Sequence, residues 1–404
     1  MTRSSIELLI LWALSFALVC GQVPFRDFEI VESIPVGTTL DNPEIRNTRE
    51  VWLEMIREAQ STIDLEQFYV SNQQGEGLEG VLQALIDVAA RGVRIRLVAD
   101  AGMAQTYPAD LARLDRQKNI EVRRIAIFRE TGGVQHSKYF IVDGEQVFIG
   151  SQNFDWRALD QIHELGFRIT HPEYARTMTK LFEMDWAAAA NGESPEIARG
   201  TGEKTFQLYP TEGDTLRWMA SASTMGQIPA DFAADEAIIV NSIDRARERI
   251  YIQLLSYSPS ARGGKYYEVL DNALRRAALR GVDVRLLLSD WCQRPYEMPY
   301  LKSLTVLPNV SVKLSTIPEL PDRYISYARV EHCKLMVVDD RTTWLGSSNW
   351  KKNYFHGSRN VGITVENPPV NEIVAKIFLR SWDGPYAWKI RPEQEYTPKE
   401  FGEK

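Results

Sequence analysis

One polar pattern occurs twice in the chain, and it restricts what the chain can fold into more than any other feature. Both copies read His-x-Lys-x-x-x-x-Asp followed by Gly-Ser-x-Asn; the first runs from His136 to Asn153 and the second from His332 to Asn349. A pattern with this many fixed positions is very unlikely to recur by chance. We therefore expect two related halves that each contribute one copy.

Each copy is predicted to form a β-hairpin. In the first copy, residues 143–146 (Asp-Gly-Glu-Gln) separate two β-rich runs, which is typical of a tight turn. With the middle two residues as the loop, Lys138 would face Ser151 and His136 would face Asn153 across the hairpin. Alternate residues of a strand point to the same side of a sheet, so these polar side chains would share one patch.

The second copy predicts the same arrangement, with Lys334 facing Ser347 and His332 facing Asn349. If the two patches meet, their ammonium, hydroxyl and amide groups suit a phosphate, and a pair of imidazoles can supply a nucleophile and a general acid without a metal. We expect the lysines to hold the nonbridging oxygens with help from the asparagines. The serines would add weaker, neutral hydrogen bonds.

The aspartates of the pattern have a different expected role. Asp143 and Asp339 lie at the two predicted turns. An aspartate at a turn commonly bonds to the local backbone. We therefore expect both to be structural parts of the motif.

The duplicated pattern resembles the His-Lys-Asp motif that defines the phospholipase D superfamily, which it matches in full. Within that superfamily, the chain is most similar to the group of lysosomal single-strand 5' exonucleases and related viral and bacterial proteins. This closer similarity rests on Gly150–Gly166, Tyr327–Asp339 and Gly346–Phe355, and extends loosely over residues 41–382. The resemblance implies a phosphodiesterase acting through a covalent phosphohistidine, with both halves in one rigid body, a pseudo-twofold axis and the active site between the halves.

The duplication extends beyond the motifs and predicts the fold class. Ser61–Ser71 parallels Glu248–Ser258, and Gly77–Asp100 parallels Tyr266–Asp290. Each pair of segments reads as a strand, an amphipathic helix and an apolar strand. A helix between two strands favours parallel pairing, whereas the motif hairpins pair antiparallel. We expect an α/β fold in which each half is a mixed sheet flanked by helices.

Composition and local pattern suggest where the parts begin and end. We expect a signal peptide at residues 1–21, one phospholipase D-like half at 22–198, the other at 199–382, and a C-terminal tail at 383–404. The boundary near residue 198 lies among Ala, Ser, Gly and Pro, and Thr215–Ala220 reads as a short strand. The tail is polar and contains proline, which predicts loose packing.

The N-terminal segment has the layout of a secretory signal, with Arg3 followed by an apolar run from Leu8 to Cys20. The run is short for a membrane span. Cleavage near Gly21 would leave a secreted, periplasmic or lumenal protein with no integral membrane span. Two alternatives stay open: acylation of Cys20, or an uncleaved membrane anchor.

The net charge of −7 and the pI of about 5.5 restrict the partners. Such a balance supplies no broad basic surface for duplex nucleic acid, so a nucleic-acid strand or lipid head group would have to bind locally in a cleft. The substrate expected is a phosphodiester. The sequence does not indicate the oligomeric state.

Neither a disulfide framework nor a metal site is predicted. After signal cleavage only Cys292 and Cys333 remain, which leaves room for a single bridge between them. His163, His171 and His356 have no second histidine, cysteine or carboxylate at metal-ligand spacing. We therefore expect no metal and no other cofactor.

Several aromatic residues lie near predicted strand ends or just after the motifs, where they could stack nucleic-acid bases or line an acyl groove. Packing in the core or at a rim is the alternative for each of them. They are Tyr69, Trp156, Tyr257, Trp350, Tyr354 and Phe355.

An asymmetry between the copies predicts the roles of the histidines. Glu164 and Asn360 occupy the same place after the first and second motif. In the resembled superfamily, an acidic residue in the place of Glu164 hydrogen-bonds a catalytic imidazole, and a carboxylate makes the ring a better base and nucleophile. We therefore expect Glu164 to orient His136 as the nucleophile, with His332 as the general acid.

The function favoured by the sequence is a secreted or lumenal, metal-independent phosphodiesterase, and the resemblance implies single-stranded nucleic-acid ends as its substrate. One alternative is a phospholipase D or transphosphatidylase that acts on phospholipid head groups. The other is a noncatalytic protein that binds phosphate. Histidine and lysine are intact in both copies, which argues against the noncatalytic alternative because binding alone requires cations but no nucleophile and acid.

Overall fold

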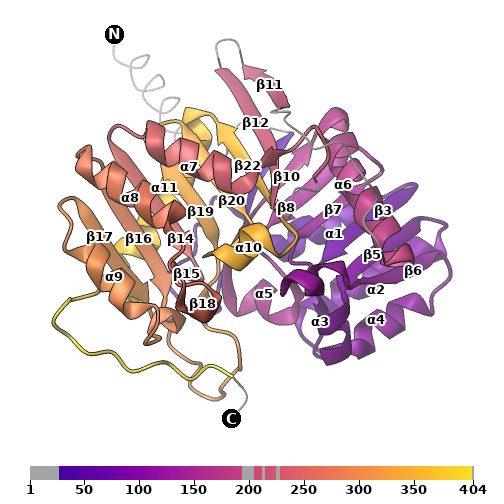
Figure 1. The fold of residues 1–404 in the computed structure, drawn as a ribbon. Helices are drawn as coiled ribbons and strands as arrows, with labels where there is room; N and C mark the ends of the chain where they lie inside the picture. Colours follow the sequence, from indigo (N-terminus) through magenta and orange to yellow (C-terminus); the bar gives the residue numbers. More distant parts are fainter. Residues whose placement is uncertain (1–26, 193–203, 212–213, 224–227, 403–404) are drawn as a thin grey trace, which may run out of the picture.

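The computed structural model describes residues 27–192, 204–211, 214–223 and 228–402. Two similar halves lie side by side (Figure 1). The main sheet of the first half has the strand order β2 (Arg46–Asn47), β1 (Phe28–Ser33), β10 (Ile162–Thr170), β8 (Gln146–Gly150), β7 (Lys138–Val142), β3 (Thr62–Gln67), β5 (Arg94–Asp100) and β6 (Ile120–Ile125). β18 (Val330–Glu331), from the second half of the chain, pairs with β10.

The main sheet of the second half has the same inner strand order, with β11 and β23 added at its two edges. Its strands are β11 (Thr205–Thr211), β12 (Asp214–Ser223), β22 (Asn360–Glu366), β20 (Thr342–Gly346), β19 (Lys334–Val338), β14 (Arg249–Leu254), β16 (Asp283–Ser289), β17 (Val310–Ser315) and β23 (Ala387–Lys389), and β13 (Ala233–Ala234) pairs with β12. In the first sheet β3, β5 and β6 are parallel, and in the second β14, β16 and β17 are parallel. The motif hairpin of each half is antiparallel. The predicted duplication and mixed sheets are confirmed.

Most of the remaining elements also correspond between the halves. The first half contains α1 (Thr48–Glu58), α2 (Gly77–Ala90), α3 (Ala101–Thr106), α4 (Pro108–Asp115), η1 (Ile127–Thr131), α5 (Trp156–Asp160), α6 (Pro172–Asn191) and the short pair β4 (Val70–Ser71) with β9 (Phe154–Asp155). The second half contains α7 (Asp235–Arg245), η2 (Arg262–Gly264), α8 (Glu268–Leu279), η3 (Asp290–Cys292), α9 (Met298–Thr305), α10 (Lys352–His356), α11 (Pro368–Asp383) and the pair β15 (Tyr257–Ser258) with β21 (Trp350–Lys351). Gly92 and Gly281, with φ of 107° and 88°, follow α2 and α8 and allow the chain to leave each helix in a left-handed conformation.

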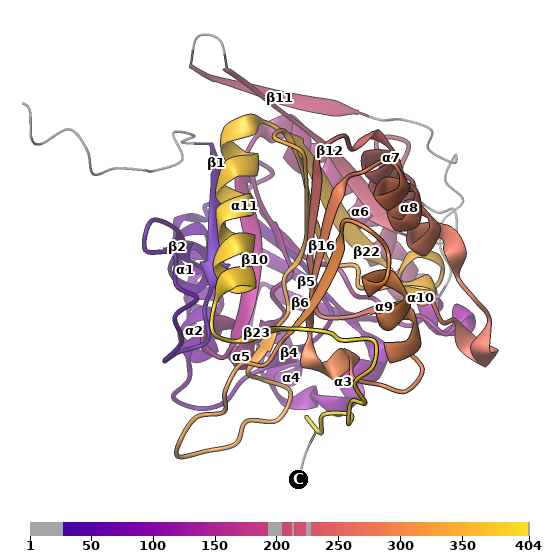
Figure 2. The ribbon, with the colours of Figure 1, turned by 90° about the vertical axis from the view of Figure 1, so that its left-hand side faces the viewer.

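The halves share a hydrophobic core. This core contains side chains of both main sheets together with α6 and α11, for example Phe167, Phe182, Leu335 and Phe378. Separate cores lie beneath α1 and α2 in the first half and beneath α7 and α8 in the second. Figure 2 shows α11 on one side of the second sheet and α7 and α8 on the other. Each sheet is therefore covered by helices on both faces, as predicted.

The motif hairpins differ by one residue from the predicted register. Val142 pairs with Gln146, and the second hairpin has the equivalent pairing, so each loop contains three residues instead of two. The reason is the backbone at Asp143 and Asp339, which adopts the left-handed region with φ of 54° and 50° and places each aspartate inside its loop. The predicted facing pairs of Lys138 with Ser151 and of Lys334 with Ser347 were therefore wrong, as were those of each motif histidine with its asparagine.

The C-terminal segment packs against the second half, which differs from the loose tail predicted by its polar sequence (Figure 1). β23 adds to the sheet beside β17. Phe401 stacks on Trp291 with ring centroids 4.0 Å apart, and Lys399 forms a 2.9 Å ion pair with the buried Asp290. Isolated aromatic residues and one lysine anchor this segment because each has a fitting partner in the fold.

Thr215–Ala220 lies within β12, as predicted. The signal segment at residues 1–21 and the boundary near residue 198 lie outside the described residues. Within the described part of the chain, none of the helices combines the length and the apolar character needed to cross a bilayer.

Candidate active site

A cavity of about 370 Å³ opens where the two halves meet and contains residues of both motifs. We call it the central cavity. Its lining residues are Phe68, Tyr69, Met103, Thr106, Tyr107, His136, Asn153, Arg157, Ile162, Leu255, Trp291, Tyr327, Val330, His332, Asn349 and Tyr354. The fold thus brings together the histidine and the asparagine of each copy.

Two backbone bridges between the halves place the histidines. β18 pairs in parallel with β10, and the amide of His332 donates to the carbonyl of His163 at 2.9 Å. On the other side of the seam, Gln135 bridges to Arg359, and the amide of His136 donates to the carbonyl of Arg359 at 2.8 Å. Each motif histidine is therefore held by the backbone of the opposite half.

The same crossing decides the side-chain partners of the histidines. Nδ1 of His332 lies 2.7 Å from Oε2 of Glu164, and Nδ1 of His136 lies 2.9 Å from Oδ1 of Asn360. The prediction that Glu164 orients His136 was wrong. It assumed a contact within one half, whereas β10 and β22 each run beside the histidine of the other half.

The amide of Asn360 determines the tautomer of His136. Its Nδ2 donates to the carbonyl of Tyr354 at 2.8 Å, and its Oδ1 accepts from the hydroxyl of Ser347 at 3.1 Å. An oxygen that faces the ring requires an N–H at Nδ1 of His136. In the neutral ring the lone pair is then on Nε2.

Lys138 and Lys334 are buried behind the motif histidines and are not among the residues that line the central cavity. Each ammonium donates to the carbonyl of the motif histidine that precedes it, at 2.7 Å in both copies. Burial and the neighbouring Lys334 lower the pKa of Lys138 well below its ordinary value, and burial lowers the pKa of Lys334 to about 8. Within the described residues neither ammonium forms an ion pair, so the pair favours an anionic ligand.

The lysines also act on the imidazoles. Burial and both nearby lysines lower the pKa of His136 and of His332 well below the ordinary histidine value. Burial raises the pKa of Glu164 to about 8, although Lys334 opposes this shift. The Glu164 and His332 pair therefore retains one proton up to about pH 8.

The serines and asparagines of the motifs have different environments. The hydroxyl of Ser151 joins the hairpin to the backbone of Leu165, and that of Ser347 joins its hairpin to Val361 and Asn360. The amides of Asn153 and Asn349 instead line the central cavity, and their Oδ1 atoms are buried without a partner among the described residues. The asparagines are thus available to a ligand, whereas the serines hold strands together.

The motif aspartates lie away from the cavity. Asp143 accepts hydrogen bonds from the backbone amides of Gln60, Ser61 and Thr62 at 2.7–2.9 Å. Asp339 accepts equivalent bonds from the amides of residues 247–249 at 2.8–3.2 Å. These contacts tie each hairpin loop to the start of the neighbouring strand.

The aromatic residues of the sequence divide into two groups. Tyr69 and Tyr354 line the central cavity, while Trp156, Tyr257, Trp350 and Phe355 are buried in the packing around it. The cavity also contains aromatic residues that the sequence analysis missed: Phe68, Tyr107, Trp291 and Tyr327. Phe68 follows β3 and Trp291 follows β16, so both lie at the carboxyl ends of parallel strands, where ligands commonly bind in α/β folds.

Arg157 also lines the cavity and was not predicted. Its guanidinium is bound to Asp155 at 2.5–3.1 Å and donates to the carbonyl of Ser326 in the second half at 3.1 Å. Asp155 keeps the arginine in place, and the arginine keeps a positive charge at the cavity wall.

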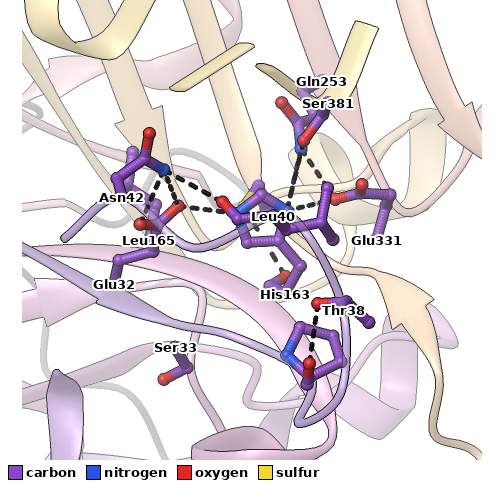
Figure 3. Close-up of polar contacts among 12 residues, drawn as sticks. Glu32, Ser33, Thr38, Leu40, Asn42, His163, Leu165, Gln253, Glu331 and Ser381 are labelled. Carbon is purple, nitrogen blue, oxygen red and sulfur yellow. Dashed lines mark hydrogen bonds and ion pairs between the residues drawn. The ribbon is translucent and has the colours of Figure 1, made fainter. Parts of the chain in front are cut away.

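A second buried polar group lies behind the site. Atoms of His163, Glu331 and Cys333 lie within 4.8 Å of one another, and their types would suit a metal. Both ring nitrogens of His163 are already bonded to carboxylates, however, so the group forms a hydrogen-bonded network (Figure 3). Spacing along the chain could not reveal it. Cys292 and Cys333 are both buried free thiols.

Comparisons with known proteins agree with this geometry. The family model described as "Cardiolipin synthase, PLD-like domain" matches residues 52–186 and 239–382, one stretch in each half. The 5'-3' exonuclease PLD3 of Bos taurus is 33% identical over 395 residues, which cover 89% of this chain and 79% of that protein. Phospholipase D Z of Dictyostelium discoideum is 29% identical over 388 residues, which cover 90% of each protein.

Solved structures share the fold at lower identity. Phosphatidylserine synthase of Haemophilus influenzae has a TM-score of 0.60 at 15% identity, covering 85% of each chain. Polyphosphate kinase of Porphyromonas gingivalis has a TM-score of 0.58 at 14% identity, covering 91% of this chain and 49% of that one. At these identities the similarity concerns the fold alone.

Proposed function

The chain belongs to the phospholipase D superfamily and is a phosphodiesterase, and we propose that it cleaves the ends of single-stranded nucleic acids through a phosphohistidine, without a metal. One observation carries the proposal. Two buried lysines that form no ion pair among the described residues, and whose nearby carboxyl group is Glu164, lie beside two imidazoles at the seam of the halves. Such a site supplies the positive charge and the nucleophile and acid that phosphoryl transfer needs.

The carboxylate partner favours His332 as the nucleophile. A ring nitrogen that forms a bond to phosphorus leaves the imidazole positively charged, and Glu164, 2.7 Å from Nδ1, would stabilise that charge. Asn360 offers His136 only a neutral amide. These roles are the reverse of those predicted from the sequence, because the partner of each histidine is the reverse.

The proposed reaction has two steps, and His136 ends the second step with a proton that replaces the one it gave up in the first. In the first, a lone pair of His332 forms the N–P bond, the bond from phosphorus to the leaving oxygen breaks, and protonated His136 gives that oxygen its proton. In the second, water attacks phosphorus, His136 accepts a proton from the water, and the N–P bond breaks. Lys138 and Lys334 hold the nonbridging oxygens in both steps.

A basic hollow beside the central cavity supports a polymeric substrate. It has a volume of about 540 Å³ and is lined by Thr131, Gly132, Ser260, Ala261, Lys265, Lys351, Lys352, Asn353, His356 and Gly357. α10 contributes to both spaces, because Tyr354 lines the central cavity and Lys352 lines the hollow. Lys265 and Lys352 are exposed and form no ion pair among the described residues, so they could hold the next phosphates of a strand.

A phospholipid head group is the second candidate substrate. It is favoured by the similarity to Phospholipase D Z over 90% of both proteins. The same two-step reaction would then release the alcohol of a head group, and an alcohol could replace water as the acceptor.

The decisive experiment compares 5'-labelled single-stranded DNA with vesicles of phosphatidylcholine, phosphatidylglycerol or cardiolipin, with EDTA in every reaction. We expect cleavage of the DNA and of bis-p-nitrophenyl phosphate, and no activity in a His332→Asn control. Cleavage of lipid alone would contradict the nucleic-acid substrate and favour a phospholipid head group. Loss of activity in EDTA would contradict a metal-independent reaction.

A lysine series tests the basic hollow. Lys265→Gln and Lys352→Gln should raise KM for a long strand and lower the salt dependence of kcat/KM by a slope of about 1 for each lysine. Activity on bis-p-nitrophenyl phosphate should not change, because this substrate does not reach the hollow. Lys118→Gln, another exposed lysine, is the matched control.

We also propose that the mature protein is secreted or lumenal, after cleavage near Gly21. The signal-like N-terminal segment supports this. N-terminal sequencing of protein exported from its native cell tests it. A chain that still begins at Met1 and stays with membranes would favour the anchored alternative.

A further inference from the structure

His163 is a buried histidine that takes no direct part in the proposed reaction. It lies on β10, wholly buried, and both ring nitrogens are bonded to carboxylates. Nε2 lies 2.8 Å from Oε1 of Glu32 on β1, and Nδ1 lies 2.5 Å from Oε2 of Glu331 on β18. Figure 3 shows the imidazole between these two side chains.

The carboxylates are held from their outer sides. The amide of Asn42 donates to both oxygens of Glu32 at 3.0 and 2.9 Å, and the amide of Gln253 donates to Glu331 at 2.7 Å. Figure 3 shows Asn42 beside Glu32 and shows Gln253 above His163 and Glu331. A network in which each charged group has its partners costs less to bury and holds one geometry.

This network lies one residue away from the catalytic pair. His163 is paired with Glu331 in the register of β10 and β18, and the next residue on each strand is Glu164 and His332. Successive side chains of a strand point to opposite faces. One strand pair thus carries the His163 and Glu331 contact on one face and the Glu164 and His332 contact on the other.

The equivalent place in the other half contains a different cation. Arg359 precedes Asn360 as His163 precedes Glu164, and it binds the buried Asp185 of α6 at 2.7 and 2.8 Å. Its bridge partner Gln135 donates to Glu66 at 2.9 Å. A guanidinium keeps its charge at any pH at which proteins fold, whereas an imidazole can lose it.

The charge of His163 depends on the groups that face it. Burial alone would lower its pKa, but neighbouring groups, Cys333, Glu331 and Glu32 among them, raise the pKa well above the ordinary value. Because burial raises the pKa of Cys333 to about 11, this thiol is neutral near pH 7, and the glutamates supply the negative charge. Glu164 lies on the other face of the same strand, but the charge of His163 still acts on it and opposes the rise of its pKa on burial.

We propose that His163 is a positioning residue: as a buried imidazolium it fastens the strand of Glu164 to the strand of His332 and sets the contact through which Glu164 orients the nucleophile. This inference rests on the proposed function. Loss of the positive charge would leave Glu32 and Glu331 facing each other across a neutral ring, which destabilises the strand pair. The His136 and Asn360 contact does not depend on this charge, because Arg359 holds that side of the seam.

The test compares His163→Gln with the wild-type enzyme on bis-p-nitrophenyl phosphate. We expect kcat to fall by about 10- to 100-fold with little change in KM, because a small displacement of the nucleophile affects the chemical step more than binding. His171→Gln, a change at a histidine far from the network, should retain wild-type kcat. A kcat of His163→Gln within twofold of wild type in folded protein would overturn the proposal.

A second substitution distinguishes the effect of the lost charge of His163 from the effect of its changed shape. Adding Glu331→Gln to His163→Gln removes one of the two buried carboxylates that have lost their cation, and leaves two carboxamides that can bond to each other. The double variant should recover part of the lost kcat. No recovery would show that the charge pair is not what orients His332.

Nitrogen NMR of histidine-labelled wild-type protein tests the proposal without any substitution. At pH 6.5, at which an ordinary histidine is half protonated, both ring nitrogens of His163 should carry protons. When His163 loses its proton at higher pH, the His332 signals should shift at the same midpoint while those of His136 stay unchanged. An ordinary midpoint near pH 6.5 for His163 would overturn the proposal.

The proposed function and this inference fail in different ways. If the wild-type enzyme cleaves no phosphodiester, the proposed function fails. If the wild-type enzyme is active and folded His163→Gln matches it, only the positioning role fails.

Discussion

The two histidines of the central cavity lie in matched folds but have different surroundings. His332 contacts a carboxyl group, that of Glu164, and has the titratable His163 behind it, whereas His136 contacts the neutral amide of Asn360 and has the permanent cation Arg359 behind it. The order of the strands around the motif hairpins is the same in both halves, and a parallel backbone bridge lies next to each motif histidine. The two imidazoles therefore have matching positions in the fold, whereas the residues that contact them differ in charge.

The strongest test of this comparison replaces each histidine in turn. His136→Asn and His332→Asn should each lower kcat by about three orders of magnitude or more, because each removes a group that makes or breaks a bond. With a good leaving group, His136→Asn should still form the intermediate, and mass spectrometry should find phosphate on His332. Phosphate on His136 in the wild-type enzyme would reverse the assigned roles.

Replacing each motif lysine tests whether both halves bind the same phosphate group. Lys138→Met and Lys334→Met should each lower kcat by about two orders of magnitude, because each removes a contact that is strongest in the transition state. Circular dichroism should show an unchanged fold. Lys376→Met, on the surface, is the matched control. Near-normal turnover in either variant would remove that lysine from the site.

Exchange of the partner residues tests the difference between the halves directly. Glu164→Gln should lower kcat by about one to two orders of magnitude, because the phosphohistidine loses the charge that stabilises it. Asn360→Asp gives His136 a carboxylate and should lower kcat less. Peptide mapping of trapped enzyme should then find phosphate on both histidines in Asn360→Asp, and on His332 alone in the wild-type protein.

The pH dependence of kcat/KM follows from Lys334. Its ammonium must be protonated to hold an anionic phosphate, and burial lowers its pKa to about 8. Activity should therefore decline as pH rises through about 8, well below the ordinary lysine value of about 10.4. The low pKa of His136 requires acid conditions for a protonated general acid, so the optimum should lie on the acid side of neutrality. A plateau extending above pH 9 would contradict both assignments.

The smallest effect on activity is expected for Asp143 and Asp339, which have equivalent backbone contacts in the two halves. Asp143→Ala and Asp339→Ala each remove hydrogen bonds to the backbone amides of the neighbouring strand. Each should lower the free energy of unfolding by about 1–3 kcal/mol, with kcat of the folded protein unchanged. Urea denaturation measures the loss. A selective loss of kcat in one variant would give that aspartate a catalytic role.

Residues close together in the sequence determined a large part of this protein. The repeated motif and the segments of strand, helix and strand depend on local geometry, so they indicated two mixed sheets flanked by helices, which the structure has. The phosphate site of two histidines and two lysines that they also indicated stays a prediction. The loop length of the hairpins depends on the φ angle of one aspartate, which composition does not specify. The predicted register was therefore off by one residue.

Only the tertiary structure decided which neighbour each histidine has. Glu164 lies in the same half as His136 along the chain, yet it contacts His332, because β10 crosses the seam and pairs with β18. His163 and Glu331, the aromatic wall of the cavity and the anchored C-terminal segment likewise depend on contacts between residues far apart in sequence. The pattern of one segment contains no information about the segment it will face, since packing of the whole chain brings them together.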